Sequence, residues 1–340
     1  MKNLLVIFIT VVLCAGFAFA QTNTATVDQY GTNIGIINQT GLDNDAAIDQ
    51  GTLATPVTNN KVPGYVGDWI GGAFIDQVGV DNDASINMHN GGNNGSSVYQ
   101  FGDDNKGYQD IGTSHSIGTS WTLMGVDLDQ LGDNNWATQK TVSSFGSAGV
   151  KRMFVIQDGD YNIADQLSIG GYTNAQDIVQ KGDNNNNPTE SGNAFDLSAT
   201  GLANPLSLPW AHKPAGDYTQ YSNQMYGTTH MYVEGNDNNT AQYQEYTVWG
   251  LSGRNHAMLD LYGNTNDVAQ GQLGEYNSSD FDILGDGNVV TGLQWGDSNI
   301  ATVYILGNNN VAAIEQLNDG NNGSINQVGS GNTGLILQQP

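Results

Sequence analysis

Cysteine is almost missing from this 340-residue sequence, which contains a single one, Cys14. It lies in the one long apolar run, Leu4 to Phe19, which closes with Ala18-Phe19-Ala20. A short apolar run after a basic start, with an A-x-A end, is typical of a secretory signal peptide and is too short for a membrane anchor. We therefore expect residues 1–20 to be a signal peptide, and the mature chain to have no thiol, disulfide or membrane anchor.

Basic residues are scarce as well, with 9 Lys and Arg against 34 Asp and Glu, a net charge of −25 and a pI near 4.1. Such a surface repels phosphates, so we expect no nucleic-acid partner. The five His residues are scattered, and H-E-x-x-H, G-x-S-x-G and P-loop motifs are absent. We expect no catalytic, cofactor or metal residues and no enzyme. A polysaccharide-cleaving β-helix is the enzyme alternative, but such enzymes gather acids in one groove, whereas Asp here follows a repeat.

The chain is rich in Gly (45 residues), Asn, Gln and Asp, and in its C-terminal third these follow an 11-residue repeat, apolar-x-Q-x-G-x-x-N-x-A-x. The repeated position falls at Leu261, Gln272, Ile283, Gln294, Ile305, Gln316, Gln327 and Gln338. Five residues after each of the first seven stands an Asn: Asn266, Asn277, Asn288, Asn299, Asn310, Asn321 and Asn332. A repeat without gaps indicates stacked structural units.

The part N-x-A-x-apolar-x-Q alternates with period two, so its small, apolar and Gln members share one face of a strand. The part x-G-x-x is rich in Gly, Asp and Asn and is turn chemistry. Two units therefore make a coil of about 22 residues, and stacked coils give two facing parallel sheets with strands about 4.8 Å apart. The sequence predicts an all-β fold, a β-solenoid of about eleven two-strand coils with surface-loop insertions.

The same unit runs through the first two thirds of the chain, with its register broken by insertions. Numbered in order, every second unit carries Gln at the repeated position in ten of eleven cases: Gln39, Gln77, Gln100, Gln130, Gln157, Gln180, Glu245, Gln272, Gln294, Gln316 and Gln338. The other units are mixed there, as at Met88, Ile111 and Val233. We expect one continuous Gln ladder on one sheet, each side-chain amide bonding the next, and Gln elsewhere, such as Gln242, to be exposed.

An Asn column is expected beside this ladder. Its earlier members are Asn44, Asn82, Asn105, Asn135 and Asn162, and it continues through the seven Asn residues of the C-terminal third. A buried amide without a partner costs more than a made bond contributes, so both columns would penalise slipped registers.

The unit Q-x-G-x-x-N-x-A-x-x-x-Q resembles the repeat of curlin, the subunit of bacterial curli fibres. Good matches run from Gln39 through Ala46 to Gln50 and from Gln130 to Ala137. The resemblance implies a β-solenoid secreted through an outer-membrane pore, with nucleator or chaperone partners, that polymerises at the surface of a Gram-negative bacterium into biofilm fibres. The chain departs from that pattern in having about twenty-two units and long insertions.

The domain organisation expected is a solenoid in two parts, residues 21–182 and 231–340, around a Pro- and aromatic-rich insertion loop, residues 183–230. Shorter insertions are expected at about 51–72, 112–125, 142–152 and 246–250. Four of the six Trp residues fall in insertions, where they either form a surface for glycans or proteins or pack back on the solenoid: Trp69, Trp121, Trp210 and Trp249.

Acidic turns recur at equivalent positions of the repeat, as in Asp43-Asn44-Asp45 and Asp103-Asp104-Asn105. Stacked carboxylates could collect Ca²⁺, but the spacing differs from that of calcium-binding β-rolls, and Asx turns are the favoured interpretation.

Neither end of the repeat array carries a cap, since its first strand begins at about Ala25 and its last reaches Gln338. An exposed strand edge is a template for another chain, so the expected partner is a second copy, added end to end. The function favoured is a structural subunit of an extracellular amyloid-type fibre. The alternative is a monomeric secreted adhesin or glycan-binding module.

Overall fold

The alternating half of each 11-residue unit forms a strand in the computed structural model, and the Gly- and Asx-rich half forms the turn to the next strand. The structure describes residues 22–29, 31–32, 34–51, 57–58, 72–89, 94–113, 123–143, 150–169, 174–186, 198–200, 220–223, 227–245 and 254–339. The expected signal peptide and the four insertion Trp residues lie outside these ranges.

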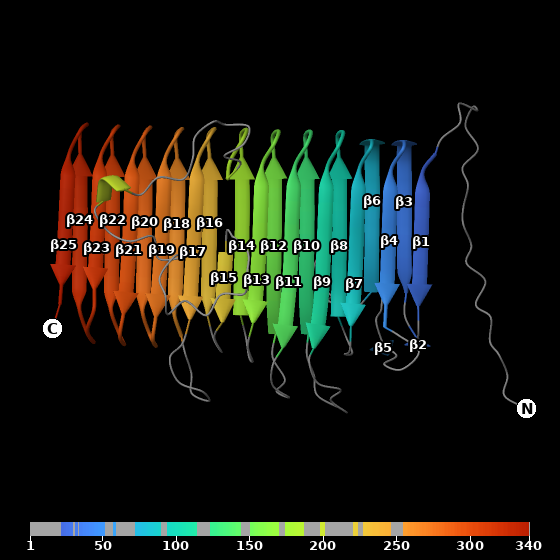
Figure 1. Cartoon of the computed structure of the whole chain (residues 1–340), viewed down its shortest axis with the longest axis horizontal. Coiled ribbons are helices and arrows are strands. Elements are labelled where there is room, and N and C mark those ends of the chain that lie inside the picture. Colours follow the sequence, from blue (N-terminus) through green and yellow to red (C-terminus); the bar gives the residue numbers. More distant parts are fainter. Residues whose placement is uncertain are drawn as a thin grey trace, which may run out of the picture.

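The strands lie in two long sheets that share the coils between them (Figure 1). The 12-stranded sheet contains β1 (Thr24–Gln29), β4 (Asp45–Gln50), β7 (Asp83–His89), β9 (Lys106–Thr113), β11 (Trp136–Ser143), β13 (Ile163–Ile169), β15 (Gln220–Asn223), β17 (Asn239–Glu245), β19 (Asp267–Leu273), β21 (Val289–Trp295), β23 (Val311–Gln316) and β25 (Thr333–Gln338). The 11-stranded sheet contains β3 (Gly35–Leu42), β6 (Gly72–Val80), β8 (Asn94–Phe101), β10 (Leu123–Leu131), β12 (Val150–Asp158), β14 (Asn174–Lys181), β16 (Thr228–Glu234), β18 (His256–Tyr262), β20 (Ser278–Leu284), β22 (Ile300–Leu306) and β24 (Asn322–Val328).

Every pairing within the two sheets is parallel, so each strand lies directly above the equivalent strand of the previous coil. The all-β solenoid predicted from the repeat is confirmed. Two short strands, β2 (Gly31–Thr32) and β5 (Val57–Thr58), pair with each other at the N-terminal end. The one short helix among the described residues is a 3-10 turn, η1 (Ser198–Thr200), and no helix there has the length and apolar character of a membrane span.

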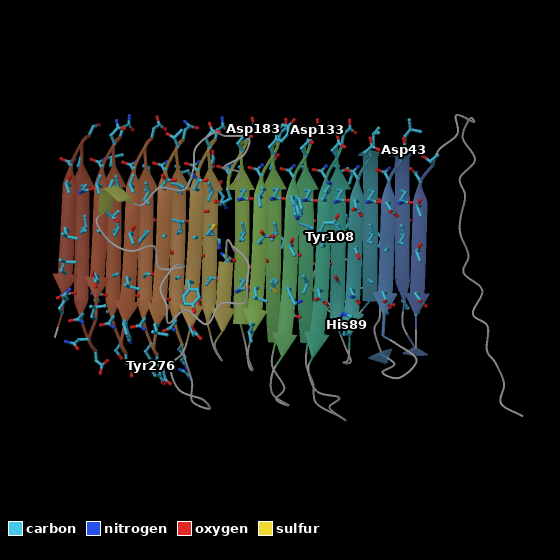
Figure 2. All side chains as sticks on the ribbon, in the orientation of Figure 1. Asp43, His89, Tyr108, Asp133, Asp183 and Tyr276 are labelled. Carbon is cyan, nitrogen blue, oxygen red and sulfur yellow. The ribbon has the colours of Figure 1, made fainter. Side chains whose placement is uncertain are left out.

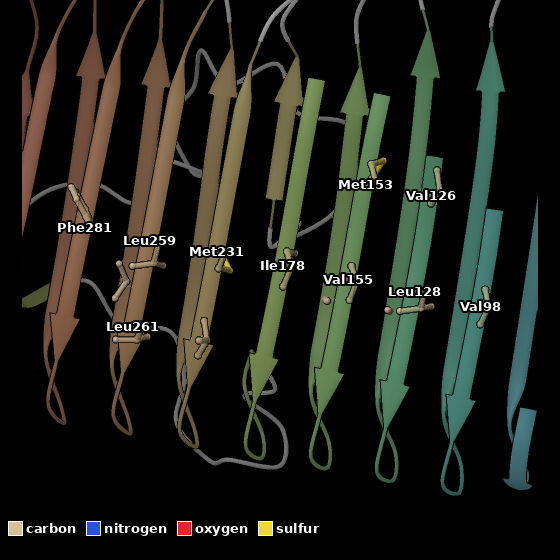
Figure 3. Packing of buried hydrophobic residues seen from close by; sticks show 14 of the residues in the cluster. Val98, Val126, Leu128, Met153, Val155, Ile178, Met231, Leu259, Leu261 and Phe281 are labelled. Carbon is tan, nitrogen blue, oxygen red and sulfur yellow. The ribbon is translucent and has the colours of Figure 1, made fainter. Parts of the chain in front are cut away.

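The core is a thin apolar layer between the sheets, made by the inward side chains of each strand (Figure 3). In the 11-stranded sheet its central row runs through Ile75, Val98, Leu128, Val155, Ile178, Met231, Leu259, Phe281 and Val303, all at most 1% exposed. Phe281 is the largest of these, and it fits because Gly292 faces it: a Cβ at Gly292 would lie 2.4 Å from the Phe281 ring.

One unit was missed by the sequence prediction. β15 lies inside residues 183–230, which were assigned wholly to an insertion, and it pairs with β13 and β17. The structure therefore has twelve plus eleven strands in its long sheets, one unit more than the twenty-two expected. The main-chain N–H of Asn186 donates to the oxygen of Asn238, and β15 begins at Gln220, opposite Gln166.

Candidate functional site

The columns of Gln and Asn are the most regular polar feature of the molecule. In the 11-stranded sheet Gln39, Gln77, Gln100, Gln130, Gln157 and Gln180 lie in one register column. Each Nε2 donates to the Oε1 of the next Gln, over 2.8 to 3.0 Å. Apart from Gln39, which is half-buried, these side chains are fully buried. The structure thus brings the first six predicted ladder residues together.

The remaining predicted ladder residues lie in the other sheet. Gln272, Gln294, Gln316 and Gln338 form a ladder in the 12-stranded sheet, over 2.8 to 3.0 Å. The prediction of one continuous Gln ladder is therefore wrong. Its cause is β15, because omitting one strand from the count exchanges the two sheets for every later unit. The member placed at Glu245 is also off by one residue, since Gln244 is in register with Gln272.

A third ladder was not predicted. Gln109, Gln139, Gln166, Gln220, Gln242 and Gln270 form it in the 12-stranded sheet, over 2.7 to 3.0 Å. Gln242 is fully buried, so the expectation that it is exposed is wrong. The signal was present in the sequence as Gln two residues before the repeated position, as in Gln242-Tyr243-Gln244 and Gln270-Gly271-Gln272.

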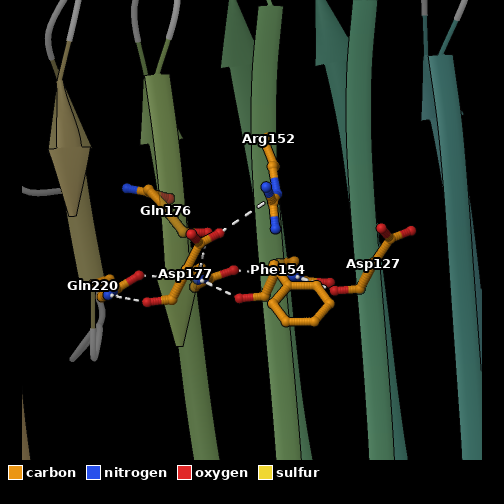
Figure 4. Close-up of polar contacts among 8 residues, drawn as sticks. Asp127, Arg152, Phe154, Gln176, Asp177 and Gln220 are labelled. Atoms are coloured by element: carbon orange, nitrogen blue, oxygen red, sulfur yellow. Dashed lines mark hydrogen bonds and ion pairs between the residues drawn. The ribbon is translucent and has the colours of Figure 1, made fainter. Parts of the chain in front are cut away.

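Each ladder Gln also joins the two sheets, because its second Nε2 hydrogen donates to a main-chain oxygen of the facing strand. Gln130 donates to the oxygen of Lys106 over 3.1 Å, and Gln294 to that of Ser278 over 2.9 Å. Figure 4 shows the same bond from Gln220 to the oxygen of Asp177, at 2.9 Å. An inner rung therefore makes three hydrogen bonds, which offsets the cost of burying its amide.

The Asn residues form two columns, one on each edge of the solenoid, where a single column was predicted. The first follows the turns that leave the 11-stranded sheet and contains Asn23, Asn44, Asn82, Asn105, Asn135, Asn162, Asn185, Asn238, Asn266, Asn288, Asn310 and Asn332. The second, on the opposite edge, contains Asn255, Asn277, Asn299 and Asn321. In both, the main-chain N–H of each Asn donates to the Oδ1 of the Asn in the preceding coil.

The acidic turns are part of the same scaffold. Asp133 Oδ1 accepts the main-chain N–H of Asp103, and Asp160 Oδ1 accepts that of Asp133, over 2.8 and 2.7 Å. Figure 2 shows these turns along one edge, with Asp43, Asp133 and Asp183 labelled. Asp43 has a positive φ of 56°, a conformation that short polar side chains tolerate. Within the described ranges, no three His, Cys, Asp or Glu side chains are grouped so as to hold a metal ion.

The outer face of the 11-stranded sheet carries partly buried carboxyl groups. Burial, with the charge of Asp127 as a smaller contribution, raises the pKa of the Asp129 carboxyl to about 6. Burial also raises the pKa of Asp127, against the hydrogen bond from Ser97 and the charge of Arg152. These groups are tightly packed among their neighbours on the sheet, and their charged forms are disfavoured by burial.

Both ends of the stack are open in the described part of the chain. β1 and β3 have no paired strand beyond them at one end, and β25 and β24 have none at the other. The inward residues Val27, Ile37 and Ile336 are only partly buried, whereas the residues next to them in the same columns, Ile48, Ile75 and Ile314, are at most 1% exposed.

No known protein family and no curated protein matches this chain. The arrangement of its polar side chains, two sheets with in-register amide columns and open ends, is thus the basis for a functional proposal.

Proposed function

We propose that the protein is a structural subunit of an extracellular, curli-like amyloid fibre used in biofilm matrix and adhesion. The observation that carries the proposal is the pair of open, in-register ends. Each end offers main-chain donors and acceptors of two parallel strands, and an exposed edge of this kind pairs readily with another chain. The resemblance of the repeat to curlin supports the same function.

Stacking a second copy on an end would complete the burial of Ile336 on one side and of Val27 and Ile37 on the other. Fully burying an aliphatic side chain contributes about 1.5 to 3 kcal/mol. Val27, Ile37 and Ile336 are already partly buried, so docking would add a part of that free energy for each. Alternate residues of the six-residue β25 and of the eight-residue β3 would gain main-chain hydrogen-bond partners as well. The repeating geometry of the coils would continue across the junction with no change of register.

The proposal extends to secretion through an outer-membrane pore, with nucleator or chaperone partners, to the surface of a Gram-negative bacterium. The fibre itself needs no cofactor under this proposal, because its contacts are main-chain and amide hydrogen bonds. Whether the chain is the main or a minor subunit depends on its abundance in the fibre.

The direct test is dilution of the purified protein from denaturant, followed by thioflavin fluorescence and fibre diffraction. We expect fluorescence and a reflection at about 4.8 Å along the fibre. Leu335→Pro removes a main-chain donor that faces the open end of β25, whereas the N–H groups of Gly334 and Ile336 face β23. Fibre growth should therefore stop while the monomer still folds. Leu335→Ala, which removes the same side chain but keeps the N–H, is the matched control and should form fibres normally. A soluble, monomeric product from the unchanged chain would rule out the proposal.

Glycan binding is the second candidate, because an exposed aromatic pair lies on the outer face of the 12-stranded sheet. Tyr108 and Trp136 are in edge-to-face contact with ring centroids 6.4 Å apart, and Trp136 is 46% exposed. Flat aromatic rings of this kind contact sugar rings. If this were the main function, Trp136→Ala would abolish retention on a polysaccharide column, whereas the fibre function predicts normal polymerisation of that variant.

A further inference from the structure

The inward column that carries the first Gln ladder changes character along the 11-stranded sheet. After Gln180 it continues through Val233, Leu261, Ile283 and Ile305, four apolar residues, and in the last strand it returns to Gln at Gln327. Gln327 is 6% exposed and donates from Nε2 to the oxygen of Val311 over 3.0 Å. Its Oε1 is buried and has no partner among the described residues. A fifth apolar residue would suit the single chain better.

What sets position 327 apart is its place at the open end. The residue behind it is Ile305, and no described strand pairs with β24 on its other side. A side chain that is poorly satisfied within its own chain but faces an open sheet end is explained by a partner that binds there.

The direction of the hydrogen bonds identifies that partner's contact. In all three ladders Nε2 donates toward the C-terminal end of the stack. At the N-terminal end of the stack, Gln29, which donates to Gln50 over 2.6 Å, and Gln39, which donates to Gln77, accept at Oε1 from no described residue. At the C-terminal end, Gln327 and Gln338 each have one Nε2 hydrogen without a described acceptor, since each donates only to a main-chain oxygen.

The two ends are thus complementary in both sheets. The C-terminal end offers Gln338 in the 12-stranded sheet and Gln327 in the other, both as donors, and the N-terminal end offers Gln29 and Gln39 in the same columns as acceptors. The first Asn column also has complementary ends, but its hydrogen bonds run the other way, because each main-chain N–H donates toward the N-terminal end of the stack. The main-chain N–H of Asn23 donates to no described residue, and the Oδ1 of Asn332 accepts from none.

We propose that a second copy of this chain docks in one register and one polarity, β1 on β25 and β3 on β24. Gln338 then donates to Gln29 of the next copy, Gln327 donates to Gln39, and Asn23 donates to Asn332. This proposal rests on the fibre function and specifies its interface. Joining two N-terminal ends would set acceptor against acceptor, and joining two C-terminal ends would set donor against donor, so the fibre is polar.

The register is tested by cross-linking on the outer face, where the ladders are not disturbed. Asn38 and Asn326 are exposed and lie in one column, next to Gln39 and Gln327. In a Cys14→Ser background, Asn38→Cys with Asn326→Cys places the two Cα atoms about 4.8 Å apart across the junction, within disulfide range. Asp76→Cys with Asn326→Cys is the matched control, one coil further, at about 10 Å and out of range.

After mild oxidation of fibres we expect covalent multimers from the Asn38 and Asn326 pair and none from the control pair. Fibres that cross-link in the control pair, or in neither, would overturn the proposed register. An unchanged chain that forms no fibres would instead contradict the proposed function.

The Gln contacts are tested by a double-substitution cycle on the critical concentration for fibre growth. Gln39→Leu and Gln327→Leu should each raise it about tenfold, because each leaves a junction amide unpaired. The critical concentration of the double variant should rise by less than the product of the two, since it places Leu against Leu, as apolar residues already face one another from Val233 to Ile305 in that column. The two residues lie at opposite ends of the monomer, so their effects on monomer unfolding should be additive. A multiplicative rise in critical concentration would refute the contact.

Discussion

Replacing Gln130 by Leu should reveal how strongly the rungs of a ladder depend on one another. Gln130 accepts from Gln100 over 2.8 Å, donates to Gln157 over 2.9 Å and donates to the oxygen of Lys106 over 3.1 Å. Leu fills a similar volume, so the main effect is three orphaned polar groups in a dry interior. With about 1 to 3 kcal/mol for each buried orphan, and part of it offset by the apolar side chain, we expect a loss of about 3 kcal/mol.

The double variant with Gln157→Leu distinguishes a ladder from independent buried amides. Each single substitution orphans two amide groups and one main-chain oxygen, but the double variant again orphans only two amide groups, those of Gln100 and Gln180, with two oxygens. We therefore expect the double loss to fall about 2 kcal/mol short of the sum, a factor of about 30 in the folding equilibrium.

The measurement is urea unfolding of freshly diluted monomer, followed by far-ultraviolet circular dichroism. Gln130→Leu with Gln294→Leu is the control pair, because these residues belong to different ladders in different sheets, and their losses should add. Additive losses for Gln130 and Gln157 would refute the ladder as a cooperative unit.

Three further substitutions test other parts of the structure. Gly292→Ala should lower the unfolding free energy by about 1 to 3 kcal/mol, and Phe281→Leu in the same chain should recover part of it, as read from urea midpoints. Asp129→Asn should raise the unfolding free energy at pH 7 by about 1 to 2 kcal/mol after solvent screening, and should have no effect below pH 4. The reason is that the pKa of Asp129 is raised in the folded state, so the stability it gives is present at low pH and is lost as the pH rises through about 6. Equal effects at both pH values would contradict the shift. Gln242→Leu should slow fibre formation as much as Gln294→Leu, and a normal rate would show that its ladder is dispensable.

The sequence was sufficient to predict the register of the first half of the solenoid. Gln39, Gln77 and Gln100 stand in the column predicted from Gly and Asn at fixed distances, because a turn that needs positive φ and an Asn that bonds the coil above leave little freedom. Gly263 illustrates the constraint, since its φ is +139° and a Cβ there would lie 2.1 Å from the oxygen of Gly285.

The sequence was insufficient where a unit loses its signature. β15 has four residues and begins at Gln220, so it lacks the Asn and small residue by which the other units were found. Successive strands of the solenoid alternate between the two sheets, so the sheet of each strand depends on the count of all strands before it. One missing strand therefore assigned Gln272 and all later Gln residues to the wrong sheet. The buried ladder through Gln242 is harder to predict, because its Gln lies two residues before the repeated position and one of its members, Gln220, belongs to the unit that lacks the signature.

The three ladders also limit how such a chain can change during evolution. Duplicating a coil next to itself keeps every amide beside an amide, so the solenoid can lengthen locally at little cost. Moving a coil from the first half into the second is different, because a Gln inserted between Leu261 and Ile283 would have no neighbour to bond. The number of coils can therefore change during evolution, whereas their order is constrained. Related chains should differ in length by whole coils, and an added coil should lie within the ladder whose Gln it carries.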